Sequence, residues 1–130
     1  MTDHPNAKLV MRGFEAFATG DMDTMSEILA PDIKWHTPGN NMLSGDYEGL
    51  ESVLELFGRV GQETAGTISN EVHAILADDE HAVALVKTTA SRGGKSLDGA
   101  GAFVFHVSGG RATEVWNLIM DQAAADDFWS

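Results

Sequence analysis

The sequence predicts an α+β fold in which a curved antiparallel sheet wraps around N-terminal helices and forms an internal pocket. Three observations predict it. Apolar residues recur at helical spacing mainly in the first half of the chain. The second half has strand character and is divided by two glycine-containing turns, Arg92–Lys95 and Ser108–Arg111, which indicate antiparallel hairpins. Helices segregated from strands favour layered α+β packing, and a twisted sheet over helices leaves a cleft.

Two helices are expected near the N-terminus. The first covers residues 6–19, and Gly20 can end it in the left-handed conformation. Its apolar face contains Val10, Phe14 and Phe17. A shorter helix is expected over residues 22–29, with a capping box that begins at Thr24 and an end imposed by Pro31.

A strand, a loop and a third helix follow. Ile33–Thr37 alternates in polarity and predicts a short strand, and the turn-rich residues 38–46 predict a loop. Residues 49–61 form the clearest helical pattern of the chain. Its apolar stripe consists of Leu50, Val53, Leu54, Phe57 and Val60.

The remaining chain predicts four strands in a meander and a final short helix. The strands are expected over residues 68–77, 81–91, 96–107 and 112–120. Asp121 is placed to cap the N-terminus of the last helix.

Composition narrows the class of protein. The chain has 130 residues, of which 43% are hydrophobic and 22% charged, as expected for one soluble domain over 1–130. It has no cysteine, which excludes disulfides and thiolate metal sites and suits a reducing cytoplasm. Because no apolar run is long enough for a membrane span and no signal sequence is evident, we expect a cytoplasmic location. The net charge of -12 repels phosphate backbones and anionic lipid, so neither nucleic acid nor a membrane is an expected partner.

The sequence resembles the SnoaL-like branch of the nuclear-transport-factor-2-like superfamily, which is related to ketosteroid isomerases and polyketide cyclases. The segments that carry the resemblance are 14–23, 28–38, 45–53, 101–107 and 110–117. It covers residues 8–129 and implies a cone-shaped pocket in a cystatin-like α+β roll. It also implies a homodimer through the outer sheet face, which apolar and threonine-rich outer strand faces favour. Members include enzymes and non-enzymatic binding proteins, so the fold alone does not transfer an activity.

The resemblance also identifies where isomerase residues would lie. That chemistry needs a carboxylate base, a tyrosine and a protonated aspartate that hold the enolate oxygen. By the resemblance these positions fall at Thr37, at or beside Gly13, and near Gly101, and none of these residues can act in that way. The single tyrosine, Tyr47, lies in a different segment. Steroid isomerase activity by that apparatus is therefore not expected.

Two other residues are candidate catalytic bases. Asp121 follows Trp116-Asn117, and the resemblance to polyketide cyclases places an acid/base aspartate in this region; its alternative role is that of a helix cap. His36 lies beside the position of the isomerase base and titrates near neutral pH. Strand alternation argues that His36 faces away from the core if Trp35 faces into it.

The expected pocket lining is mainly aromatic and aliphatic. Strand alternation places Phe103 and Phe105 on one face, and likewise Asn117 and Ile119, with Asn117 suited to orient a ligand. The full set of expected ligand-binding residues is Trp35, Met42, Phe57, Phe103, Phe105, Asn117 and Ile119. The five histidines are scattered, so no metal site and no cofactor are expected.

The leading hypothesis is therefore a pocket that binds a small, largely apolar molecule. Proton-transfer chemistry there, such as cyclisation, isomerisation or dehydration, would use Asp121 or His36 as the base. The alternative is a non-enzymatic ligand-binding or dimerisation module.

Overall fold

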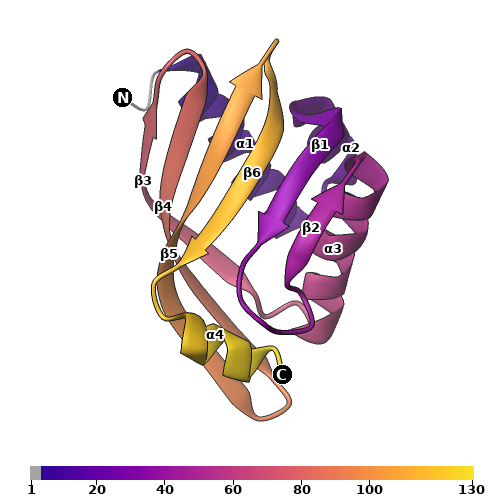
Figure 1. Ribbon diagram of the computed structural model, residues 1–130, viewed down its shortest axis with the longest axis vertical. Helices are drawn as coiled ribbons and strands as arrows, with labels where there is room; N and C mark the ends of the chain where they lie inside the picture. The colour runs from indigo at the N-terminus through magenta and orange to yellow at the C-terminus, as the bar shows by residue number, and fades with distance from the viewer. Residues whose placement is uncertain (1–3) are drawn as a thin grey trace.

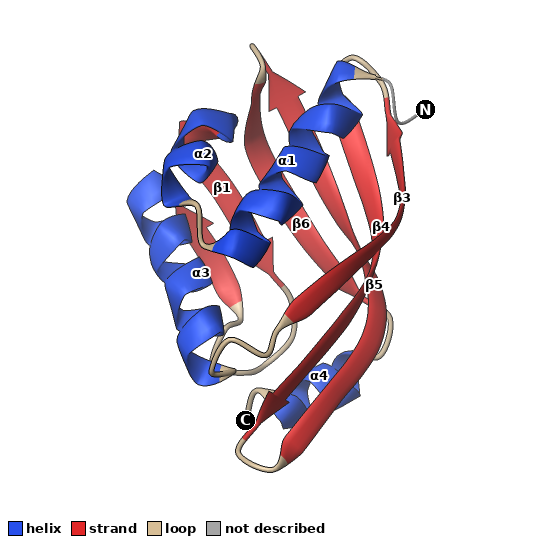
Figure 2. Ribbon diagram, turned by 180° about the vertical axis from the view of Figure 1, so that it is seen from behind, coloured by secondary structure: helices blue, strands red, loops and turns tan. Residues whose placement is uncertain are grey.

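The computed structural model describes residues 4–130, which form a six-stranded curved sheet with the N-terminal helices packed against its concave side and the C-terminal helix against the far end of its long central hairpin (Figures 1 and 2). The helices are α1 (Pro5–Thr19), α2 (Met22–Ile28), α3 (Leu50–Glu63) and α4 (Gln122–Phe128). The strands are β1 (Leu29–Thr37), β2 (Gly45–Glu48), β3 (Ser69–Ala77), β4 (His81–Arg92), β5 (Lys95–Ser108) and β6 (Arg111–Ile119). The predicted α+β class is confirmed.

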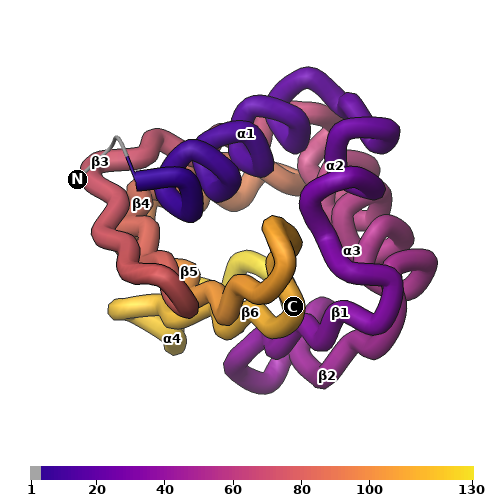
Figure 3. The backbone as a smooth tube through the Cα atoms, turned by 90° about the horizontal axis from the view of Figure 1, so that it is seen from above, coloured from indigo at the N-terminus to yellow at the C-terminus, as the bar shows by residue number. Residues whose placement is uncertain are grey.

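The sheet has the strand order β2-β1-β6-β5-β4-β3 and does not close. Strands β3 to β6 form the expected meander, with turns at Gly93-Gly94 and Gly109-Gly110. The pairing of β1 with β6 is parallel, unlike the antiparallel pairing of all the other neighbours. Figure 3 shows the strong curvature of the sheet, with α1 and α3 facing its concave side.

The N-terminal helices differ from the prediction in how α2 begins and ends. Helix α1 ends as expected at Gly20, whose φ is 71°. Helix α2 is capped by Asp21, which accepts a hydrogen bond from the Thr24 backbone N–H at 3.1 Å, so the expected cap at Thr24 was wrong. Pro31 does not end this helix either. It lies within β1, where a register shift between Leu29 and Lys34 marks the kind of irregularity that tolerates proline in a sheet.

Strand β2 lies partly within the segment that was expected to be a loop. Gly45–Glu48 pairs antiparallel with β1, Tyr47 lying opposite Trp35. The segment has no apolar alternation because β2 is a short, largely exposed edge strand. Strand β1 and the residues between β1 and β2 form one side of the cavity described below.

None of the helices within residues 4–130 is both long enough and apolar enough to cross a membrane.

Candidate functional site

An internal cavity of about 170 Å³ lies between the concave face of the sheet and helices α1 and α3. Two rows of cross-strand neighbours form its floor. Trp35 of β1 and Phe105 of β5 lie in one row, on either side of the fully buried Val115 of β6, and the next row contains Asn117 and Phe103. On β4 the neighbours of the two phenylalanines are fully buried alanines, Ala82 and Ala84, which leave room for the large rings.

Aromatic rings from both layers meet edge to face around this cavity. Phe14 on α1 contacts Phe103 with a centroid separation of 5.4 Å, and Phe57 on α3 lies 5.0 Å from Trp35 and 5.5 Å from Phe17. Edge-to-face pairs of this kind add stability beyond the area that they bury. The network therefore fixes the helices on the sheet and gives the cavity a rigid aromatic wall.

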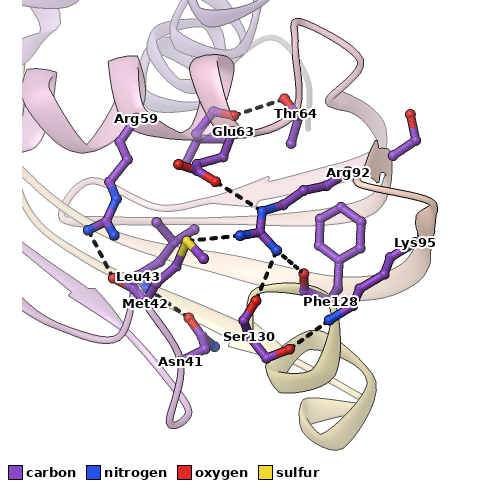
Figure 4. A network of polar contacts seen from close by, with 12 residues as sticks. Asn41, Met42, Leu43, Arg59, Glu63, Thr64, Arg92, Lys95, Phe128 and Ser130 are labelled. Carbon is purple, nitrogen blue, oxygen red and sulfur yellow. Dashed lines mark hydrogen bonds and ion pairs between the residues drawn. The ribbon is translucent and has the colours of Figure 1, made fainter.

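Most of the residues expected to bind a ligand lie at this cavity. The lining residues among them are Trp35, Phe57, Phe103, Phe105, Asn117 and Ile119. Met42 does not line it. Its backbone carbonyl accepts a hydrogen bond from Arg59 at 3.1 Å, and its sulfur lies 3.8 Å from Arg92, at the end of the cavity near α4 (Figure 4).

The three positions that the resemblance assigns to isomerase residues also line the cavity: Gly13, Thr37 and Gly101. Gly101 has a steric role there. A Cβ atom at this position would collide with the backbone carbonyl oxygen of Leu118 on β6, so no larger residue fits without a backbone shift. An aspartate at residue 101 is thus excluded by the local backbone, in addition to being absent from the sequence.

Within residues 4–130 the cavity lining includes no acidic, basic, histidine or tyrosine side chain. The polar side-chain groups of the lining are amides, hydroxyls and the indole N–H groups of Trp35 and Trp129. Asn41 is hydrogen-bonded to Asp126 and to the Leu43 backbone N–H, at 2.8 and 2.9 Å. Asn70 accepts a hydrogen bond from the Thr88 hydroxyl at 2.7 Å. Chemically, the cavity offers apolar contact and neutral hydrogen bonds.

Asp121 lies outside the lining of this cavity. It caps α4, where its carboxylate accepts a hydrogen bond from the Ala124 backbone N–H at 3.1 Å, and it is exposed. The predicted helix cap is confirmed, and the carboxylate does not reach the cavity from this position.

His36 lies on the opposite face of the sheet from Trp35. Its Nδ1 is 2.7 Å from Asp46 of β2 and its Nε2 is 2.6 Å from Glu114 of β6, while its ring stacks on Trp116 at 5.3 Å. Hydrogen bonds to Asp46 and Glu114 raise the pKa of His36 above its ordinary value of 6.5. Because a neutral imidazole has a single N–H, both bonds are made together only by the protonated ring.

A polar network around Arg92 connects β4 and α3 to the C-terminal helix α4 (Figure 4). The guanidinium contacts Glu63 of α3 at 3.0 Å and donates to the backbone carbonyls of Phe128 and Ser130, each at 3.0 Å. Lys95 donates to the Asp127 carbonyl at 2.7 Å. These contacts hold α4 in place.

Helix α4 contributes Ala125 and Trp129 to the cavity wall, through the helix and the residue that follows it. Asp126 fastens the helix to the loop before β2, because it accepts hydrogen bonds from Asn41 and Asn40, which lower its pKa. Gly39 permits this close approach, since a Cβ atom there would collide with Asp126 and Gln122. Sequence reasoning assigned Arg92 only to a hairpin turn, because its partners lie 29 to 50 residues away.

The outer face of the sheet, onto which Figure 1 looks, is apolar in part. Five large apolar side chains of residues 4–130 are well exposed, and four of them lie on or just beyond strands of this face, the fifth being Met11 of α1. The four are Leu76, Leu85, Leu118 and Met120. We call them the outer-face cluster.

The chain matches known proteins over its full length. Residues 10–115 match the family model of the SnoaL-like domain. An uncharacterized protein of Mycobacterium tuberculosis, Rv0034, is 34% identical over 131 residues, which is all of both chains. The structure of Bal32a, from a soil-derived mobile gene cassette, is 38% identical with a TM-score of 0.94 over 97% of each chain. A Xanthomonas campestris protein of unknown function with a cystatin-like fold is 27% identical, with a TM-score of 0.88 over 95% of this chain and 96% of that one.

Proposed function

The chain belongs to the SnoaL-like domain family, and we propose that its cavity binds a small, largely apolar molecule without catalysing general acid–base chemistry. The observation that carries the proposal is the lining itself: aromatic and aliphatic side chains, with amides, hydroxyls and indole N–H groups as the polar groups among the described residues. Ligand sites of this type are concave and mostly apolar, with a few polar groups that set orientation.

The same lining argues against side-chain proton transfer inside the cavity. A general base must come within hydrogen-bonding reach of the proton that it removes. His36 is held on the outer face by Asp46 and Glu114, and Asp121 is committed to the N-terminus of α4. Binding is therefore the function that the cavity of this chain supports best.

The size of the cavity indicates the size of the ligand. An apolar protein cavity of about 150 Å³ is known to hold benzene, and this cavity has about 170 Å³. Burying about 150 Å² of apolar ligand surface contributes about 4 kcal/mol, which corresponds to a dissociation constant of about 1 mM. A ring-sized molecule thus fits, and tight binding requires polar contacts in addition.

Titration of the protein with p-xylene, followed by NMR of the tryptophan indole N–H signals, tests the proposal, because Trp35 and Trp129 line the cavity. We expect saturable shifts that Leu9→Trp, which fills the cavity from α1, removes. Leu54→Trp on α3 is the matched control, since Leu54 is half-buried but does not line this cavity. An unsaturated response, or equal binding by Leu9→Trp, would contradict the proposal.

A further inference from the structure

Two side chains on one part of the cavity wall have both donor and acceptor capacity that no other described residue uses. The Thr37 hydroxyl oxygen is buried and has no hydrogen-bond partner within residues 4–130. Asn117 also lines the cavity, and among the described residues none forms a hydrogen bond with its side-chain amide. Because a buried polar group without a partner is costly, the Thr37 hydroxyl indicates where a ligand supplies one, and the half-buried Asn117 amide lies beside it with its hydrogen-bonding capacity unused.

Thr37 and Asn117 are neighbours on adjacent parallel strands. The pairing of β1 with β6 places His36 beside Trp116 on the outer face, and each of the two cavity residues is one position further along its strand. They therefore face the same side of the sheet. Across the other edge of β6, Asn117 is paired with Phe103, so a hydroxyl, an amide and an aromatic ring follow one another along one row.

The other polar side chains of the wall are either engaged or can only donate: the indole N–H groups of Trp35 and Trp129 and the NH₂ of Asn70 are donors alone. Asn41 binds Asp126 and the Leu43 backbone, at the end of the cavity near α4. Thr88 donates to the side chain of Asn70, which occupies the oxygen of that amide. Thr37 and Asn117 are thus the lining side chains among the described residues that have both a donor and an acceptor free for a ligand.

We propose that the ligand is an uncharged, ring-containing molecule with a hydroxyl or carboxamide group that Thr37 and Asn117 hold between them. The inference rests on the proposed function of the cavity. The asparagine amide supplies both a donor and an acceptor, and the threonine hydroxyl does the same, so they complement a group with both capacities. The ring of the ligand then lies against the side chains of Phe103 and Trp35, whose ring centroids are 6.1 Å apart.

Ligands of the same shape that carry a charge are not expected to bind in this cavity. A carboxylate or ammonium ion in this cavity would lose its hydration and meet no opposite charge among the described lining residues. The cavity therefore selects a hydroxyl or carboxamide over a carboxylate of the same shape. This selection distinguishes the inference from general apolar binding.

Three probes of matched shape test the inference: p-xylene, p-cresol and p-toluate, measured by NMR titration with the whole chain. We expect p-cresol to bind about tenfold more tightly than p-xylene, and p-toluate to show no saturable binding. Asn117→Leu and Thr37→Val should each remove most of the advantage of p-cresol and leave p-xylene binding intact. Thr88→Val is the matched control, because its hydroxyl already has a protein partner, and it should keep the p-cresol to p-xylene ratio.

The outcomes separate the inference from the proposed function. If p-xylene binds but p-cresol binds no more tightly, or p-toluate binds equally well, the anchoring role is wrong and apolar binding stands. If none of the three probes binds, the proposed function is wrong and the inference with it. Thermal unfolding of each variant confirms that it is folded, and should Asn117→Leu not fold, Thr37→Val decides alone.

Discussion

Arg92 donates a hydrogen bond to the backbone carbonyl of Phe128 at 3.0 Å, so that a side chain of β4 holds the C-terminal helix over the end of the cavity. The same guanidinium pairs with Glu63, and both side chains are largely shielded, with exposed fractions of 19% and 34%. The position of α4 thus depends on one charged group that serves several segments of the chain.

We predict that Arg92→Met lowers the free energy of unfolding by about 2 kcal/mol, because it leaves Glu63 and backbone carbonyls without their donor. Hydrogen exchange of the α4 amides should become faster as well. Arg12→Met is the matched control, since Arg12 pairs with Glu27 on an exposed surface, where such pairs contribute little. Equal effects of the two substitutions would show that the Arg92 network does not hold α4.

The His36 cluster predicts a pH dependence of stability. Because the pKa of His36 is raised in the folded state, its contribution is fully present below the ordinary value of 6.5 and is lost as pH rises through the higher folded value. Urea unfolding between pH 6 and 9 should therefore show a decline in wild type that His36→Gln lacks. NMR titration of the His36 ring should give a midpoint above 6.5. A midpoint at or below that value would contradict the prediction.

The tight packing of Gly101 against β6 predicts that adding a single methyl group at this position strongly destabilises the fold. Gly101→Ala should lower the free energy of unfolding by about 3 kcal/mol, because the new Cβ atom collides with the Leu118 carbonyl oxygen. Gly99 lies on the same strand, and a Cβ atom there meets no atom within 4 Å, so Gly99→Ala serves as the control and should change stability by less than about 1 kcal/mol. Chemical denaturation measures both.

Substitution of Asp121 and His36 tests whether ligand binding depends on the cavity alone. The double variant Asp121→Ala/His36→Ala should bind p-xylene as tightly as wild type, because neither residue lines the cavity. Loss of the α4 cap at Asp121 should cost about 1 kcal/mol of stability. Reduced affinity in a folded double variant would indicate that one of the two residues acts on the ligand after all.

The outer-face cluster leads us to propose that two copies associate through this sheet face. An apolar patch on a sheet is a typical subunit interface, and a second copy of the same face is its simplest complement. Light scattering should give twice the chain mass of 13.9 kDa for wild type and the chain mass for Leu118→Glu. Met11→Glu on α1 is the control, with an exposed fraction of 37% against 50% for Leu118. A monomeric wild type at high concentration would exclude the dimer.

Periodicity was enough to predict most of the fold. The alternation that places Phe103, Phe105 and Asn117 on one face also predicted much of the cavity wall, because side chains of a strand alternate strictly. The parallel pairing of β1 with β6 was beyond such reasoning, since local pattern does not show which distant strands meet. The same holds for the network around Arg92 and for the free hydroxyl of Thr37, which depend on long-range contacts.

The three cavity-lining positions Gly13, Thr37 and Gly101 also define what protein engineers could build here. A new carboxylate at residue 37 would enter an apolar enclosure, where burial raises its pKa and strengthens it as a base. The oxygen-binding partner at residue 101 cannot be added by side-chain replacement, because the β6 backbone occupies its space. A designed proton-transfer catalyst on this scaffold would have to recruit the Asn117 amide as its oxyanion donor instead.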